Sequence, residues 1–121
     1  MEKKIMSLQF FAKRIGVSVR RLGWAIVQTK NEDGETNETP AISIKGASVC
    51  FNILTDALEP LVNVGGCETK VIEASMDETA DGYEFRTSGG KCIELTFEEI
   101  DNIYANKIFS EELNRKAQRF A

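Results

Sequence analysis

The sequence predicts a single α+β domain over residues 1–121. We expect an N-terminal helix-turn-(helix or strand), an antiparallel sheet of about 4–5 strands, and a C-terminal helix or helix pair packed on a β-hairpin. Three observations support this prediction: two adjacent runs alternate like strands, a helix-capping sequence follows them directly, and an amphipathic helical pattern lies near the start of the chain. With 121 residues and 42% hydrophobic content, the chain has the length of one domain and enough apolar side chains for a core.

A β-hairpin is the clearest local feature of the sequence. The runs Tyr83–Thr87 and Cys92–Thr96 alternate apolar and polar residues, which is the period of half-buried strands. A two-residue turn would pair Phe85 with a carboxylate on one face of the hairpin, whereas a three-residue loop pairs Phe85 with Ile93. We therefore expect the three-residue loop, with Gly90 in the left-handed conformation.

A capping box follows this hairpin directly. The Thr96 hydroxyl can accept a hydrogen bond from the Glu99 amide while the Glu99 carboxylate accepts one from the Thr96 amide, which predicts a helix that starts at Phe97. Its apolar residues form one stripe that would pack on the hairpin: Phe97, Ile100, Ile103 and Tyr104. After Ala105 the chain should stay helical or restart at Ser110.

The N-terminal region combines one clear helix with one ambiguous segment. Apolar residues at helical spacing predict a helix over Ser7–Ile15, with Ser7 as a candidate cap and Gly16 as its stop. Ser18 could cap a second helix, but Gly23 is unfavourable inside a helix by about 1 kcal/mol and several β-branched residues suit a strand. The pattern is best explained by a short helix from Ser18 to Leu22 followed by a strand over Trp24–Lys30.

The middle of the chain contains a loop and a second ambiguous segment. Asn31–Thr39 is polar and acidic, so we expect an exposed loop leading to a strand over Ala41–Lys45. In Ala47–Val62 the apolar residues fit a strand through alternation at positions 49, 51 and 53, and a helix through recurrence at every fourth position. We predict a helix, because that recurrence persists for about three turns until Pro60.

The segment before the hairpin should complete a three-stranded meander. Asn63–Gly66 contains a Gly-Gly pair and reads as a loop, and Lys70–Met76 alternates as a strand. Asp77–Gly82 begins like a calcium-binding loop, but the twelfth position of such a loop would be Ser88 instead of glutamate. We therefore read this segment as a turn and predict no metal site.

Charge is distributed unevenly along the chain. Residues 1–30 contain seven Lys or Arg and one Glu, a net charge of +6, so the remaining residues carry −10 of the total of −4. We describe the chain as a basic N-terminal head over residues 1–30 and an acidic body over residues 40–121. Such a head is suited to nucleic acid, and such a body to a basic protein partner.

Composition argues against several classes of function. The chain has no histidine, the commonest general base and metal ligand, and its three cysteines are widely spaced, which indicates buried or half-buried free thiols. No residue set specifies a reaction, so we expect no enzyme, no catalytic residues and no cofactor. No apolar run approaches the roughly 18 residues of a membrane span, and the start lacks a signal peptide, which predicts a cytoplasmic protein without membrane association.

One segment of the head carries a possible DNA-binding motif. Small Ala12 would let two helices approach, Gly16 would permit a left-handed turn, and Leu22 would close a small core. At these spacings, residues 8–27 resemble the helix-turn-helix of excisionase-like and MerR-like DNA-binding proteins. The resemblance implies contact with double-stranded DNA through polar residues of the head: Lys13, Arg14, Ser18, Arg20 and Arg21.

The opening Leu8-Gln9-Phe10-Phe11-Ala12 is similar to the openings of many phage and mobile-element proteins of Gram-positive bacteria. The first functional hypothesis is therefore a small accessory protein of a phage or mobile element, in the host cytoplasm, that binds DNA through its head. The alternative is a protein-interaction module that covers a basic host protein with its acidic surface, as an inhibitor of a host factor or a minor assembly protein.

Overall fold

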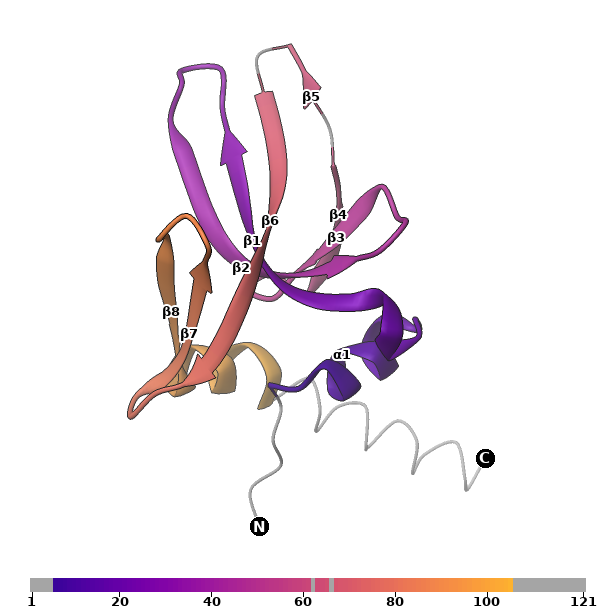
Figure 1. Cartoon of the computed structure of the whole chain (residues 1–121), viewed down its shortest axis with the longest axis vertical. Coiled ribbons are helices and arrows are strands. Elements are labelled where there is room, and N and C mark those ends of the chain that lie inside the picture. The colour runs from indigo at the N-terminus through magenta and orange to yellow at the C-terminus, as the bar shows by residue number, and fades with distance from the viewer. Residues whose placement is uncertain (1–5, 62, 66, 106–121) are drawn as a thin grey trace.

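The computed structural model describes residues 6–61, 63–65 and 67–105, which form an α+β fold (Figure 1). In chain order the elements are α1 (Leu8–Ile15), the 3-10 turn η1 (Val19–Arg21), β1 (Leu22–Lys30), β2 (Thr36–Ile44), β3 (Val49–Asn52), β4 (Ala57–Pro60), β5 (Asn63–Val64), β6 (Cys67–Glu78), β7 (Gly82–Thr87) and β8 (Cys92–Thr96). A further helix, described over residues 97–105, is called the C-terminal helix below. The predicted continuation or restart beyond residue 105 lies outside the described residues. No helix in the described ranges is long and apolar enough to cross a membrane.

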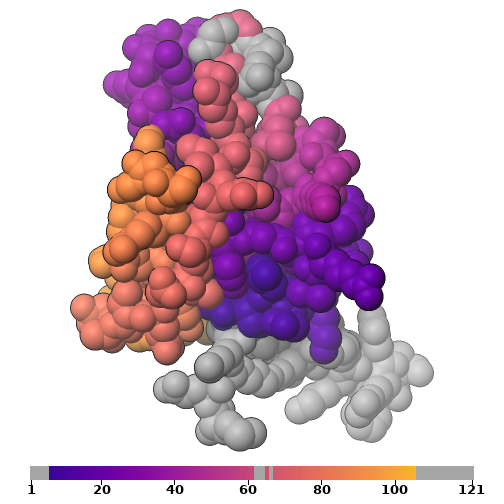
Figure 2. Space-filling view, viewed as in Figure 1, coloured from indigo at the N-terminus to yellow at the C-terminus, as the bar shows by residue number. Residues whose placement is uncertain are grey.

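All strand pairs are antiparallel, in the order β4-β3-β2-β1-β6-β7-β8 with β5 beside β6. These eight strands exceed the 4–5 that the sequence predicted. The long strand β6 belongs to two parts of the sheet, because residues 68–73 pair with β1 and residues 74–78 pair with β7. Figure 2 shows β6 running between the β7–β8 hairpin and the β3–β4 hairpin. The predicted meander of β6, β7 and β8 is thereby confirmed.

The main core lies between the helices and one face of the sheet. Figure 1 places α1 and the C-terminal helix at the same end of the strands. Phe11 is fully buried, and four aromatic rings lie with their centroids 5.1–6.1 Å from its own: Phe10, Trp24, Phe51 and Tyr104. A smaller cluster of Val27, Ala41 and Cys50 lies on the opposite face of the sheet. The alternation of strand side chains therefore supplies two cores from the same strands.

The predicted N-terminal helix is confirmed together with both of its ends. Ser7 caps α1, since its Oγ accepts from the Phe10 amide at 3.1 Å, and Gly16 ends it in the left-handed conformation with φ 82°. The segment that follows is only one 3-10 turn, and Ser18 makes no side-chain cap to it. β1 then begins at Leu22, two residues before the predicted start at Trp24. Leu22, Trp24 and Ile26 alternate along the chain and all pack in the main core, an arrangement that a strand provides and a longer second helix would not.

The register predicted for the C-terminal hairpin is confirmed. Phe85 lies opposite Ile93, and Gly90 is left-handed with φ 90°. The helix that follows has the predicted capping box, in which Thr96 Oγ1 accepts from the Glu99 amide at 3.1 Å and Glu99 Oε1 accepts from the Thr96 amide at 3.2 Å. Local signals alone were therefore sufficient for this part of the fold.

Replacing Thr96 with alanine should lower the free energy of unfolding by about 1 kcal/mol, because the Glu99 amide loses its acceptor at the start of the C-terminal helix. The midpoint of urea denaturation measures this loss. Thr96→Ser keeps the hydroxyl and serves as the control, with most of the stability retained. An unchanged midpoint in the alanine variant would show that the box contributes nothing.

The helix predicted over Ala47–Val62 is wrong, since residues 49–60 form the β3–β4 hairpin instead. The turn between the strands favours the strand pattern over the helical one. In this turn the Asn52 side chain accepts a hydrogen bond from the Leu54 amide at 3.0 Å, and the Asp56 amide donates to the Asn52 carbonyl at 2.9 Å. Asp56 is left-handed with φ 55°, a conformation that a helix interior does not contain.

Three smaller predictions also need correction. The loop predicted over Asn31–Thr39 is shorter, because β2 begins at Thr36 and pairs with β1 along its whole length. The loop predicted over Asn63–Gly66 includes a two-residue strand, β5, and β6 is longer than the predicted Lys70–Met76. Of the three free cysteines, only Cys50 is buried, whereas Cys67 and Cys92 are exposed.

Candidate nucleic-acid interface

A groove of about 450 Å³, called the basic groove below, opens on the sheet face that is turned away from α1. Its floor contains Gly23, Ser43 and Val71 from the neighbouring strands β1, β2 and β6. Arg20, Arg21 and Lys45 line it together with the single carboxylate of Glu73. Three cations and one carboxylate make this groove electropositive.

Strand pairing explains why Arg21 and Lys45 meet in this groove. Leu22 pairs with Ile44 at the end of the β1–β2 ladder, and the next pair outward is Arg21 with Lys45, whose amide donates to the Arg21 carbonyl at 2.7 Å. Leu22 and Ile44 are both buried in the main core. Arg21 and Lys45 lie one residue beyond this pair, at the end of η1 and just after β2, and both line the groove.

The Arg21 guanidinium is held in place by the backbone. Its Nε donates a hydrogen bond to the Lys45 carbonyl at 3.1 Å, and the Lys45 amide donates one to the Arg21 carbonyl. In the described part of the chain, its terminal nitrogens have no acceptor within hydrogen-bond distance. A fixed guanidinium with its outer donors free is suited to a planar or tetrahedral oxyanion.

The three cations of the groove are exposed and without ion-pair partners. Within the described residues, no carboxylate lies within 4.0 Å of Arg20, Arg21 or Lys45. Four other cations do have such partners: Arg14–Asp56, Lys70–Glu68, Arg86–Glu84 and Lys91–Glu38. The positive charges of Arg20, Arg21 and Lys45 are therefore available to an anion.

Gly23 keeps the floor of the groove low. A Cβ atom at this position would lie 3.2 Å from Ser43 Oγ, and that hydroxyl donates to the Gly23 carbonyl at 3.3 Å. In the sequence, Gly23 counted only as a residue unfavourable to a helix. In the structure it is a strand residue whose missing side chain opens the space between the cations and Glu73.

The structure separates the five predicted DNA-binding residues into three sets. Arg20 and Arg21 line the basic groove, and Lys13 and Ser18 are exposed outside its lining. Arg14 is not available to a ligand in the same way, because its side chain is only 14% exposed and pairs with Asp56, whose side chain is 5% exposed. The α1 amphipathic pattern alone does not distinguish an outward arginine from one that turns into the core.

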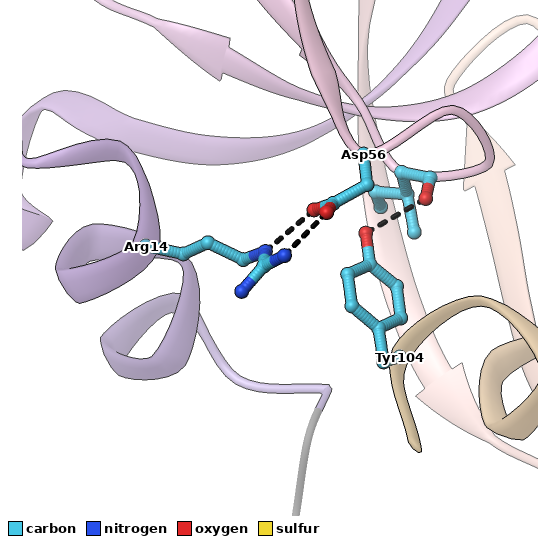
Figure 3. Close-up of polar contacts among 4 residues, drawn as sticks. Arg14, Asp56 and Tyr104 are labelled. Carbon is cyan, nitrogen blue, oxygen red and sulfur yellow. Dashed lines mark hydrogen bonds and ion pairs between the residues drawn. The ribbon is translucent and has the colours of Figure 1, made fainter. Parts of the chain in front are cut away.

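The Arg14–Asp56 pair is part of a buried network that joins three elements (Figure 3). Arg14 Nε donates to Asp56 Oδ1 at 2.6 Å, and a second bond joins the other guanidinium and carboxylate atoms. Tyr104 of the C-terminal helix donates to the Ile53 carbonyl at 2.7 Å, and its ring lies under the Arg14 guanidinium at 5.6 Å. Burial, followed by the nearby Asp56 carboxylate, raises the pKa of Tyr104 well above its ordinary value. The network therefore holds α1 and the C-terminal helix against the β3–β4 turn.

Two of the thiols, those of Cys50 and Cys92, have raised pKa values. Burial raises the pKa of the Cys50 thiol, and a hydrogen bond to Glu84, at 2.7 Å from Cys92 Sγ, raises the pKa of the Cys92 thiol. A raised pKa reduces the thiolate fraction on which cysteine nucleophiles and metal ligands depend. Across the described ranges, no group of three or more acidic or cysteine side chains is arranged to hold a metal ion.

Sequence reasoning missed Lys45 and Glu73 as residues of this site. Lys45 was visible as the last residue of a predicted strand, but nothing local placed it beside Arg21, 24 positions earlier. Comparison with protein-family models, with curated proteins and with solved structures finds no match to this chain. The functional proposal below therefore rests on the geometry of the basic groove.

Proposed function

We propose that this chain is a small accessory protein of a phage or mobile element that binds double-stranded DNA through its basic N-terminal head, with the basic groove as the contact surface. The exposed, unpaired cations Arg20, Arg21 and Lys45 are the observation that carries this proposal. Phosphates dominate the affinity of proteins for DNA, and clustered Arg and Lys without carboxylate partners are the usual means of neutralising them. The similarity of the opening residues to phage and mobile-element proteins supports the biological setting.

The alternative is a protein-interaction module, and one surface favours it. The outer face of β6, β7 and β8 carries carboxylates that share a face through the strand register: Asp77, Glu84 and Glu94. This face is suited to a basic protein partner. The two functions differ in their response to DNA, because only the first requires affinity for a duplex.

Fluorescence anisotropy with a labelled random-sequence duplex, at rising salt concentration, tests DNA binding. Arg20→Ala with Arg21→Ala should weaken the affinity about tenfold or more at low salt and reduce the slope of log K against log salt by about 1.8, the value for two lost phosphate contacts. The melting temperature should hardly change, since both side chains are exposed.

A matched control removes two cations from the other end of the sheet. Lys30 and Lys70 line a separate depression, and Lys30 lies roughly 26 Å from Leu22 along β1 on the rise of an extended strand. Lys30→Ala with Lys70→Ala should therefore reduce the affinity much less than the groove variant does. Equal losses in the two double variants, or no binding by the unaltered protein, would contradict the proposal.

A further inference from the structure

We propose that the basic groove is a phosphodiester site in which Arg21 is the orienting residue, so that the chain holds the DNA backbone irrespective of base sequence. This inference rests on the proposed DNA-binding function and specifies the group that the groove receives. The ligand is one phosphodiester unit of the duplex backbone. Arg21 supplies fixed hydrogen-bond donors, while Arg20 and Lys45 supply charge.

Arg21 is already oriented toward the groove by a hydrogen bond to the backbone. Because Nε is already bound to the Lys45 carbonyl, the plane of the guanidinium is fixed and its terminal nitrogens are the donors left for a ligand. Two parallel N–H donors match two oxygens of a phosphate, and a side chain that is already oriented loses less entropy when it binds. Arg20 has no hydrogen bond of this kind among the described residues, and neither does the Lys45 ammonium.

Positive charge lines the groove next to Arg21. The Arg21 and Lys45 backbones are joined just beyond the β1–β2 ladder, where the Lys45 amide donates to the Arg21 carbonyl, and both residues line the groove. An oxyanion bound there would be attracted by both cations. Among the described residues no carboxylate lies within 4.0 Å of either cation, so both charges are available to an oxyanion.

The groove has no element that could enter the major groove of DNA and contact base edges within the part of the chain that the structure describes. Base edges in the major groove are usually read by a helix or a two-stranded ribbon inserted into it. Here the candidate second helix is a three-residue 3-10 turn, and the floor between the cations is formed by strand residues Gly23, Ser43 and Val71. A strand floor lined by cations is suited to the DNA backbone, and backbone contacts position a protein without specifying sequence.

Removing the Glu73 charge should raise the affinity for DNA, whereas removing a groove cation should lower it. Its carboxylate lines the same groove and opposes an anion there. Glu73→Gln removes this charge with little change in shape, so it should tighten binding of a duplex about two- to threefold, in contrast to every other groove variant. A metal-bridged or amine-binding groove would instead lose affinity in the same variant.

The decisive comparison uses Arg21→Lys and Arg20→Lys with a 12-base-pair duplex. Each variant keeps the charge, but only the first removes the oriented pair of donors, so Arg21→Lys should lose about tenfold in affinity and Arg20→Lys less than about twofold. Two duplexes of unrelated sequence should bind within about twofold of each other. A duplex with uncharged methylphosphonate linkages should lose binding.

The outcomes separate this inference from the proposed function. Equal effects of the two lysine variants, or strong preference for one sequence, would overturn the phosphodiester site while leaving DNA binding intact. If the unaltered protein binds no duplex, the proposed function fails. The phosphodiester site is then tested separately by titrating inorganic phosphate and following the amide NMR signals of Gly23 and Lys45. Signals that shift in the unaltered protein and not in Arg21→Lys would support the site. Signals that do not shift in the unaltered protein would overturn it.

Discussion

Replacing Asp56 with alanine should lower the free energy of unfolding by about 3–5 kcal/mol, because the Arg14 guanidinium would remain largely buried without its counter-charge. The left-handed backbone at Asp56, with φ 55°, adds to the loss, since alanine adopts this conformation less readily than aspartate. Urea denaturation monitored by circular dichroism measures the change in free energy. A variant that is unfolded without denaturant would agree with the upper end of this range.

Two further variants separate the charge from the backbone. Asp56→Asn keeps the left-handed preference and one acceptor, so it should cost less than the alanine variant. Asp33→Ala removes a carboxylate from the exposed β1–β2 loop and should change the stability by no more than about 0.5 kcal/mol. If Asp56→Ala costs no more than Asp33→Ala, the buried ion pair does not stabilise the fold.

Replacing Phe11 with alanine should also cost about 3–5 kcal/mol, because its fully buried ring occupies the centre of the aromatic cluster. The cavity left behind would be lined by rings from α1, β1, β3 and the C-terminal helix, which cannot all move inward together. The midpoint and slope of the urea transition give this loss, provided that the variant still unfolds in two states.

Phe97→Ala is the matched control for this cavity. The Phe97 side chain is 39% exposed and makes its ring contact with Tyr83 at 5.4 Å, so its truncation should cost much less than that of Phe11. Phe11→Leu retains part of the buried volume and should fall between the two. Similar losses for Phe11→Ala and Phe97→Ala would show that α1 does not pack as described.

The stabilising network and the basic groove can be perturbed independently. Arg14 and Asp56 lie with α1 and the β3–β4 turn, and neither residue lines the groove. Asp56→Asn should therefore lower stability while leaving the affinity for a duplex unchanged under conditions where the protein stays folded. Arg20→Ala with Arg21→Ala should do the reverse. This contrast distinguishes a loss of binding from a loss of fold.

The sequence by itself determined those elements whose signals are local. The capping box at Thr96 and Glu99, the Ser7 cap and Gly16 stop of α1, and the register of the β7–β8 hairpin all depend on residues a few positions apart. For the hairpin only one register was compatible with the pattern, because a register shifted by one residue would have placed Phe85 opposite the Glu94 carboxylate. The meander followed from the same alternation, extended by one strand.

Tertiary structure alone decided the features that depend on distant partners. Residues 47–62 carried both helical and strand periodicity, and pairing of β3 with β2 selected the strand. Arg14 could have faced solvent until Asp56, 42 positions later, met it in the core. The basic groove required β1 and β2 to pair in one register, since only that pairing brings Arg21 beside Lys45. Periodicity specifies which side of an element is buried, whereas the neighbours of its polar side chains depend on how the sheet is assembled.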